Sequence, residues 1–440
     1  MKILQAKAGK TGGPLTRSQG SRTMAGSGLL KELGEIVAGV SRARKVLLVS
    51  DVNTDRLYSR AAISSLENAG FQVRRYTLLP GEEQKNLTAL QGIYEAMASF
   101  PLGRQDLILG LGGGAVCDLA GLAAATYMRG IDYAVVPASL AAQAGGAVGG
   151  KTAVNLPLGK DLIGAYHRPL AVITDTRLLR TLPRQFMIDG MAEVIKLACV
   201  KDRQLFQYLE DIGGIDALMG RMALGEEEEI EEIVWRCTSI CHRMAEEDEQ
   251  DGNVGRLLSF GHTVGQAIET CWKYTCCHGE AIAVGMAFAA DFGEALKLTE
   301  RGTAGRLKML LHRFDLPDNL GDLAIACRQR AGSGQQITLR TEEFLPPKKN
   351  FGSFGSFDSL ASFGSFGSLD SLQSAAGQAQ AVSPAGLKGK SLEEALRETI
   401  LLDKKNRGGQ LGLVYITRIG VAGIYQTPVE ALPLAELTEG

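Results

Sequence analysis

At 440 residues and 45% hydrophobic content, the chain is long enough for two domains with buried cores. Its formal charge of −2 provides no basic excess, so we expect no nucleic-acid partner. The sequence contains no apolar run of about 18 residues, so we expect no membrane-spanning helix.

Cysteine usage indicates a reducing environment. The eight cysteines are scattered and form no paired CxxC framework. Residues 1–24 contain basic and small polar residues but no apolar signal region, so we predict a disordered N-terminal extension, with a weak transit-like segment as the alternative, and a cytoplasmic protein. Cys237, Cys241 and His242, or Cys276, Cys277 and His278, could form metal clusters, but buried helical thiols are the commoner explanation.

Residues 25–178 are expected to form an α/β domain with a doubly wound, parallel, Rossmann-like sheet. Strands alternating with helices favour this arrangement. Apolar strands are predicted over 45–50, 71–77, 107–111 and 133–137, with helices over 55–70 and 87–99.

Residues 179–344 are expected to form a mainly α-helical metal-binding domain. The helical period dominates there. Helices are predicted over 226–242, 261–272 and 279–297.

Residues 345–390 are predicted to be a low-complexity insertion. Residues 351–374 consist of eight triplets of the Phe-Gly-Ser type. One apolar side chain per triplet cannot form a core that offsets the chain entropy. A partner-binding role for the repeat is the alternative. Residues 391–440 return to the helical domain, with Ser391 as a helix N-cap and Glu394 three residues later, and they contain a strand over 412–417.

A glycine-rich loop, Gly112-Gly113-Gly114, follows the strand over 107–111. Glycines let the backbone approach a pyrophosphate, and a helix N-terminus favours its negative charge. The loop is consistent with a nucleotide site, although a tight packed turn explains the same residues equally well.

Residues 145–152 match the phosphate-loop pattern GxxxxGK[ST]. We do not expect a nucleoside triphosphatase, because residues 137–143 separate the pattern from its strand and no Walker-B aspartate is evident nearby. We interpret Lys151 as a cation that binds phosphate or substrate.

Glu193, His262 and His278 each lie in a segment typical of metal ligands. One carboxylate and two imidazoles leave a tetrahedral Zn²⁺ with an open fourth position, as a catalytic zinc requires. Lys196 is three residues from Glu193 on a predicted helix, so both can face one cavity. Alone, each histidine is more often a core or capping residue, and the Glu–Lys pair more often a surface ion pair. Together with the glycine loop, the ligand interpretation is favoured.

The chain resembles the 3-dehydroquinate synthase family of sugar-phosphate cyclases. The segments that carry the resemblance occur in the family's order between residues 25 and 425. They are residues 79–85, 112–118, 125–130, 148–155, 157–164, 190–196, 261–263, 278–280 and 402–405.

The resemblance implies site residues, cofactors and a reaction. It implies NAD on Glu82, Lys85, Gly112, Gly113, Gly114, Asp118 and Lys160. It implies Zn²⁺, with Co²⁺ as an alternative, on Glu193, His262 and His278. It implies substrate contacts and catalytic roles for Glu193, Lys151, Lys196, Arg129 from the neighbouring subunit of a homodimer, and Lys404 or Lys405. The implied activity is that of a phosphorus–oxygen lyase of the shikimate pathway, which serves chorismate and aromatic amino acid biosynthesis. It cyclises a sugar acid phosphate, 3-deoxy-D-arabino-heptulosonate 7-phosphate, to 3-dehydroquinate and releases phosphate.

Several substrate-pocket positions depart from the family's pattern. Gly145 replaces an aspartate, Asp161 and Ser259 replace asparagines, Gln266 replaces a histidine, and an expected lysine is absent near Cys241 and Arg243. Two alternatives therefore stay open: a cyclase acting on another sugar phosphate, and an inactive paralogue that acts as a binding protein.

Asp161 would repel a substrate phosphate if both were ionised and close. We therefore expect a neighbour such as Lys160 or Arg243 to neutralise this carboxylate, or the side chain to point away.

Overall fold

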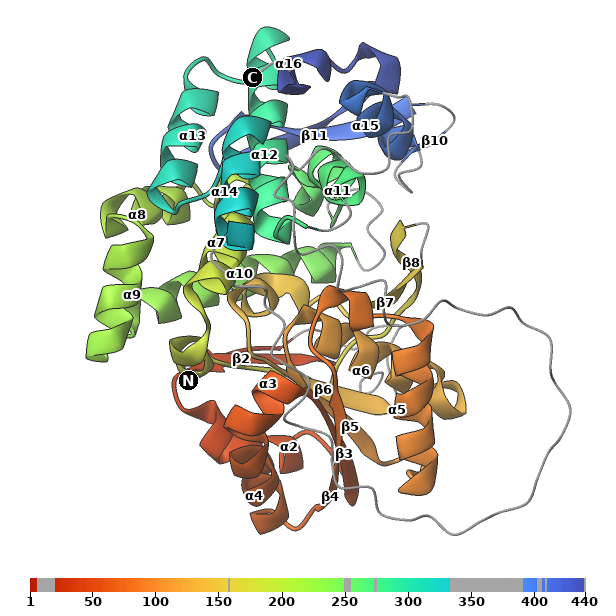
Figure 1. Ribbon diagram of the computed structural model, residues 1–440. Helices are drawn as coiled ribbons and strands as arrows, with labels where there is room; N and C mark the ends of the chain where they lie inside the picture. The colour runs from red at the N-terminus through yellow and green to blue at the C-terminus, as the bar shows by residue number, and fades with distance from the viewer. Residues whose placement is uncertain are drawn as a thin grey trace, which may run out of the picture.

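The computed structural model describes the chain in several segments, and Figure 1 shows their arrangement. A sheet with its flanking helices occupies the lower part of the view, and a largely helical region occupies the upper part. The described residues are 1–5, 20–156, 159–248, 255–272, 275–332, 391–401, 406–407 and 410–438.

A seven-stranded sheet forms the centre of the first region, in the order β1-β2-β9-β6-β5-β3-β4. Every neighbouring pair is parallel except β1 with β2. The predicted doubly wound parallel sheet is therefore confirmed. The strands are β1 (Lys2–Gln5), β2 (Arg22–Gly26), β3 (Lys45–Asp51), β4 (Gln72–Leu78), β5 (Leu107–Gly112), β6 (Asp132–Pro137) and β9 (Ala171–Asp175).

Helices cover both faces of this sheet, which explains its apolar central strands. In β3, Leu47 and Val49 pack towards α5 and α6, whereas Val46 and Leu48 pack towards α2 and α4. The helices and helical turns are η1 (Leu29–Glu32), α2 (Leu33–Ala38), α3 (Val52–Thr54), η2 (Asp55–Ser59), α4 (Arg60–Asn68), η3 (Glu82–Gln84), α5 (Leu87–Ser99), α6 (Gly114–Thr126), η4 (Tyr127–Arg129), η5 (Ala142–Gly146) and η6 (Thr176–Thr181).

The predicted disorder of residues 1–24 is wrong at both ends of that segment. Residues 2–5 form β1, and residues 22–24 belong to β2, which pairs with β9 in parallel. Thr23 and Met24 are buried against the sheet and the helices that cover it. Too short for a recognisable periodic pattern, these strands are stabilised by the existing sheet edge. Residues 6–19 lie outside the described part.

A β-hairpin, β7 (Lys151–Leu156) with β8 (Gly159–Tyr166), leaves the main sheet after η5. The sequence did not predict it. Because Lys151 begins a strand, the segment before it does not lead into the helix that a phosphate loop requires. The structure thus agrees with rejecting a nucleoside triphosphatase.

The second region is mainly helical, as predicted, with a small antiparallel sheet beside it. One core runs from the sheet face under α6 into α7, α10 and α12. The elements are α7 (Arg184–Lys201), α8 (Arg203–Ile212), α9 (Ile215–Leu224), α10 (Glu228–Glu247), η7 (Gly255–Ser259), α11 (His262–Cys271), α12 (His278–Ala295), α13 (Thr303–Arg313), α14 (Leu320–Gly332), α15 (Leu392–Leu401), β10 (Asn406–Arg407), β11 (Gln410–Arg418), β12 (Val421–Thr427), η10 (Val429–Ala431) and α16 (Ala435–Thr438).

The return after the insertion begins as predicted. The Ser391 N–H donates to Glu394 Oε2 at 2.8 Å, and the Glu394 N–H donates to Ser391 Oγ at 3.2 Å. This reciprocal pair is a capping box. Residues 345–390 lie outside the described part, so the low-complexity insertion and the domain boundaries stay predictions. Among the described helices, none is long and apolar enough to cross a bilayer.

Candidate functional site

Three side chains of metal-ligand type, from three helices, meet in the helical region. Glu193 lies on α7, and His262 and His278 are the first residues of α11 and α12. Glu193 Oε1 lies 3.5 Å from His262 Nε2 and 3.8 Å from His278 Nε2. One ligand atom of each residue lies within 4.8 Å of the others.

The donor set fits a divalent cation. Glu193 Oε1 is buried and accepts no hydrogen bond from any residue that the structure describes. A buried carboxylate oxygen without a partner is costly unless a cation completes its environment. Together with the two imidazole nitrogens that it faces, this oxygen makes up a set of nitrogen and oxygen ligands typical of Zn²⁺.

Close packing of α11 on α12 brings the two histidines together. Gly261, the N-cap of α11, has φ +80°. A Cβ atom at this position would lie 2.6 Å from the Ile282 carbonyl oxygen on α12. Only glycine allows both this conformation and this approach. The imidazole rings consequently lie edge to face, with centroids 5.4 Å apart.

A second contact attaches the start of α12 to α7. The Gly279 N–H donates to Asp189 Oδ1 at 2.5 Å. Asp189 lies one turn before Glu193 on α7, so the same helix supplies a ligand and fixes the backbone beside His278. The sequence did not predict this role for Asp189.

The charges around the cluster favour ionised side chains. Burial opposes ionisation of Glu193, but Lys196 and the two imidazoles outweigh it and hold the pKa of Glu193 well below its usual range. Burial likewise opposes protonation of His278, but Glu269 and Glu193 raise its pKa to about 10. A metal ion must displace this proton from His278, so metal affinity should rise with pH.

Glu269 on α11 is a site residue that the sequence did not reveal. Its Oε2 lies 3.1 Å from His278 Nδ1, and its Oε1 accepts a hydrogen bond from Lys160 Nζ at 2.6 Å. Burial opposes its ionisation, but His278 and Lys160 lower the pKa of Glu269 to about 2. The sequence could have indicated Glu269 by its spacing: it lies seven residues after His262, which is two turns along the same face of the helix.

The glycine loop leaves space at the N-terminus of α6. Gly113 has φ −70° and ψ −175°, which any residue can adopt, and no side chain caps the helix there. A Cβ atom would meet only Ser139 Oγ at 3.7 Å at position 113, and nothing within 4 Å at Gly114. Since folding requires neither glycine, the open space and the helix N-terminus fit a pyrophosphate.

Lys85 is buried beside this loop among three carboxylates. It forms an ion pair with Asp118, lies 2.6 Å from Asp161 Oδ1, and lies 3.9 Å from Glu82 Oε1. Burial opposes its charge, but Asp118, Glu82 and Asp161 raise the pKa of Lys85. With three acids around one ammonium group, burial raises the pKa of Asp118 to about 7 even though Lys85 opposes the rise.

These contacts identify a neighbour that neutralises Asp161. We expected a neighbour such as Lys160 or Arg243 to neutralise this carboxylate, and the structure places the ammonium group of Lys85 against it. Asp161 has φ +55°, and its N–H donates to Asn155 Oδ1 at 3.0 Å. The Asn155 side chain also donates to Glu82 Oε1 at 2.8 Å. Asp161 and Asn155 therefore tie the β7–β8 hairpin to Glu82 and Lys85, and Lys85 also pairs with Asp118 on α6, which the glycine loop precedes.

The expected substrate residues lie in different places. Lys196 Nζ donates to Glu193 Oε2 at 2.5 Å, and this ion pair is buried rather than at the surface. Lys151 is exposed at the start of β7. Arg129 is exposed and ends η4, which follows the C-terminal end of α6, whereas the glycine loop lies at the N-terminal end of that helix. Lys404 and Lys405 lie outside the described residues.

The altered pocket positions include one tight contact. The Cys241 thiol is buried and donates to the Ala144 carbonyl at 3.6 Å. A Cβ atom at Gly145 would lie 2.2 Å from Cys241 Sγ. Burial raises the pKa of Cys241 to about 11, with smaller effects from Lys196, Glu193 and Lys151. Gly145 and Cys241, both at positions that depart from the family pattern, thus face each other near Glu193 and Lys196. Ser259 ends η7 and Gln266 lies on α11.

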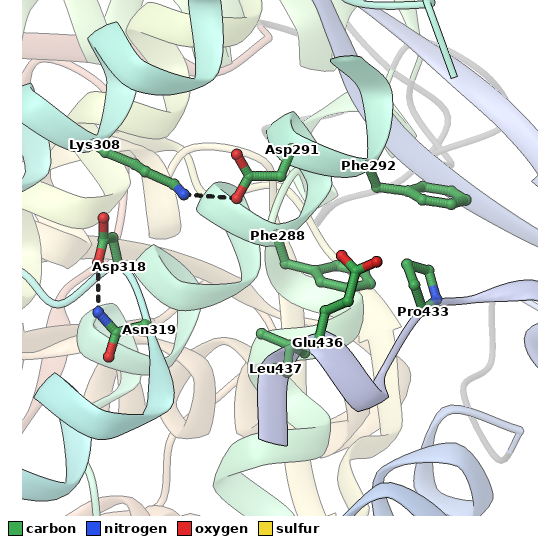
Figure 2. Close-up of a pocket in the computed structure, with 9 residues that line it drawn as sticks. All are labelled: Phe288, Asp291, Phe292, Lys308, Asp318, Asn319, Pro433, Glu436 and Leu437. Atoms are coloured by element: carbon green, nitrogen blue, oxygen red, sulfur yellow. Dashed lines mark hydrogen bonds and ion pairs between the residues drawn. The ribbon is translucent and has the colours of Figure 1, made fainter. Parts of the chain in front are cut away.

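A second group of ligand-type side chains lies elsewhere. His312, Asp318 and Asp322 have ligand atoms within 4.8 Å, but His312 and Asp322 are exposed. The Asn319 amide already donates to both aspartates, at 2.8 Å each. Figure 2 shows the adjoining pocket of about 140 Å³, lined by Phe288, Phe292 and the Lys308–Asp291 ion pair among others. None of the expected site residues lines it.

Comparisons with known proteins agree with this architecture. The model of the 3-dehydroquinate synthase N-terminal region matches residues 75–189, and that of the C-terminal region matches residues 190–330. The 3-dehydroquinate synthase of Clostridium kluyveri is 37% identical over 297 residues, which cover 67% of this chain and 80% of the relative. That of Clostridium perfringens strain SM101 is 41% identical over 284 residues, or 64% of this chain and 79% of the relative.

Solved structures share the fold at lower identity. A 2-deoxy-scyllo-inosose synthase complexed with carbaglucose-6-phosphate, NAD⁺ and Co²⁺ superimposes with a TM-score of 0.71 at 19% identity, covering 100% of both chains. The 2-epi-5-epi-valiolone synthase of Streptomyces hygroscopicus, with NAD⁺ and Zn²⁺ bound, gives 0.68 at 22% identity, covering 95% of this chain and 96% of that chain. The family models span more than half of the chain, and the chain belongs to the 3-dehydroquinate synthase family.

Proposed function

We propose that this protein is an NAD- and metal-dependent 3-dehydroquinate synthase of the shikimate pathway. It converts 3-deoxy-D-arabino-heptulosonate 7-phosphate to 3-dehydroquinate and releases phosphate. The observation that carries the proposal is the Glu193–His262–His278 cluster, with its unpartnered carboxylate oxygen, in a chain of this family.

Two cofactors supply chemistry that side chains lack. When bound, the metal ion polarises a substrate hydroxyl as a Lewis acid, and NAD accepts and returns a hydride. Glu193, His262 and His278 hold Zn²⁺ or Co²⁺. NAD is held by Glu82, Lys85, Gly112, Gly113, Gly114, Asp118 and Lys160. The open space over Gly113 and Gly114 supports the pyrophosphate assignment.

The remaining groups bind substrate and control protons. Lys196, buried against Glu193, provides a fixed positive charge beside the cluster, where a low effective dielectric strengthens its attraction for an oxyanion. Lys151, on the exposed start of the hairpin, binds the phosphate. The Cys241 thiol remains protonated at neutral pH and contributes no charge to the pocket wall.

Arg129 completes the site from a second subunit. It is exposed and distant along α6 from the nucleotide loop of its own chain. A homodimer in which each subunit supplies Arg129 to its neighbour accounts for this position. Sedimentation of the purified protein and of Arg129→Ala tests the idea: the variant should remain dimeric but lose turnover.

A phosphate-release assay tests the function. With NAD and Zn²⁺, the seven-carbon sugar acid phosphate should release phosphate and yield 3-dehydroquinate, and Glu193→Gln should abolish this activity. Binding of NAD and metal without turnover of any sugar phosphate would support a binding paralogue instead.

A second candidate is a cyclase for another sugar phosphate. The Cys241 side favours it, because the family's lysine is absent there and the protonated thiol offers a substrate carboxylate no charge. The same assay with D-glucose 6-phosphate and with sedoheptulose 7-phosphate distinguishes this activity. Release from either at a higher kcat/KM than from the sugar acid phosphate would establish the second candidate.

A further inference from the structure

Glu269 connects the two proposed cofactor sites through one buried carboxylate. Its side chain is only 3% exposed, and that of Lys160 is 16% exposed. One oxygen accepts from Lys160 Nζ at 2.6 Å, and the other lies 3.1 Å from His278 Nδ1. Both oxygens of Glu269 are thus engaged, one on each side.

The two partners of Glu269 belong to different parts of the fold. Lys160 lies on β8, in the hairpin whose Asp161 pairs with Lys85, and Lys85 in turn pairs with Asp118 on α6. The Asn155 N–H of β7 also donates to the Lys85 carbonyl at 2.7 Å. His278 begins α12 and faces Glu193 through its other ring nitrogen.

The geometry determines how Glu269 acts on His278. A carboxylate at Nδ1 requires that nitrogen to carry the proton, which leaves Nε2 as the nitrogen directed at Glu193 Oε1. A carboxylate partner also orients the ring and increases its basicity as a ligand. At the same time Glu269 holds the ammonium group of Lys160, and with it the position of β8.

We propose that Glu269 is a positioning residue that couples metal binding to NAD binding. The inference rests on the proposed function, which assigns His278 to the metal and Lys160 to NAD. A metal ion held by Glu193, His262 and His278 would fix the His278 ring, and through Glu269 it would also fix Lys160 and its hairpin. NAD therefore binds to a site that is already ordered, and the ordering entropy is not lost a second time. By linkage, NAD must increase metal affinity by the same factor.

Binding measurements on the full chain, without substrate, test the coupling. NAD affinity is measured by fluorescence titration of the metal-free protein and of the protein saturated with Zn²⁺, and Zn²⁺ affinity by competition with a chelator. We expect Zn²⁺ to tighten NAD binding by about fivefold or more, within the usual range of coupling between sites.

Three variants separate coupling from simple support of the fold. Glu269→Gln places an amide N–H₂ or a neutral oxygen against His278, so it should weaken Zn²⁺ binding by about 10- to 100-fold and remove the effect of Zn²⁺ on NAD. Lys160→Met, at a less buried position, should leave Zn²⁺ affinity without NAD near the parent value, weaken NAD binding, and remove the coupling. Glu269→Asp retains the charge and should restore part of the coupling.

The outcomes separate failure of the coupling from failure of the proposed function. Parent protein that binds both ligands, with the same NAD affinity with and without Zn²⁺, overturns the coupling alone. Coupling that persists in folded Glu269→Gln or in Lys160→Met also overturns it. Parent protein that fails to bind Zn²⁺ or NAD overturns both the coupling and the proposed function.

Discussion

The contact between Gly145 and Cys241 leads to a prediction about stability. Gly145 has φ +143°, a conformation that L residues with side chains rarely adopt. A Cβ atom there would lie 2.2 Å from Cys241 Sγ and 3.1 Å from Cys241 Cβ. Gly145→Ala therefore introduces two separate costs, backbone strain and a steric clash with the thiol.

The two costs differ in whether a second substitution can relieve them. Backbone strain of this kind costs roughly 1–3 kcal/mol. Overpacking costs roughly another 1–3 kcal/mol, so the free energy of unfolding should fall by about 2–6 kcal/mol. Cys241→Ala removes the sulfur and leaves only the 3.1 Å contact, so in the double variant about 1–3 kcal/mol should return.

Thermal melts and urea titrations of the parent, both single variants and the double variant measure this cycle. A chain of this size should lose roughly 2 °C for each kcal/mol. Gly146→Ala is the matched control, because a Cβ atom there would meet only the Ala141 carbonyl oxygen at 3.4 Å. It should cost little and should not interact with Cys241→Ala.

If the Cys241 thiol opposes a side chain at position 145, the effects of the two substitutions on stability cannot be additive. The double variant must be more stable than the sum of the two single changes allows. Purely additive effects would show that Cys241 Sγ is not what opposes a side chain at position 145. A Gly145→Ala variant that is as stable as the parent would refute both the backbone strain and the steric clash.

Four further predictions concern the cofactor sites and the insertion. His278→Ala should lose bound metal, measured by elemental analysis; retention at the parent level would mean that the ligand set is misassigned. Gly113→Val should abolish NAD binding while metal content and melting temperature stay unchanged, since its φ and surroundings tolerate a side chain; unchanged NAD affinity would indicate a structural turn. Joining about residue 348 to about residue 388 should leave stability and activity nearly unchanged, because the triplets cannot offset their chain entropy; a large drop in melting temperature would show that the phenylalanines pack. The pKa of Asp118 is raised from the usual 3.8 to about 7 in the folded state, so between these pH values the folded protein binds a proton on Asp118 that the unfolded chain does not. The stability that this proton contributes is therefore lost as pH rises from about 3.8 to about 7. Asp161→Asn removes a charge that raises this pKa, so the variant should lose less stability than the parent between these pH values in urea titrations; identical pH profiles would contradict the assigned cluster.

Local sequence patterns predicted four of the seven strands of the main sheet and the three residues of the metal cluster. Alternation of apolar strands with helices predicted β3, β4, β5 and β6 within a residue or two, because buried parallel strands need continuous apolar runs. The residue types in short motifs identified Glu193, His262 and His278, since few side chains can bind a metal ion. These features depend on residue chemistry and short-range periodicity, which a sequence displays directly.

Contacts between distant segments were decided only by the tertiary structure. No local pattern relates Lys85 to Asp161, Lys160 to Glu269, or Gly145 to Cys241, although each pair is in contact or within reach of it. The same holds for β1 and β2, which are too short to show a pattern and form because the sheet edge offers unpaired hydrogen-bonding groups. The sequence thus determined which residues can do the chemistry. Packing of the hairpin and of α11 against α12 decided which of them meet, because burial and pairing energies depend on neighbours that lie far apart along the chain.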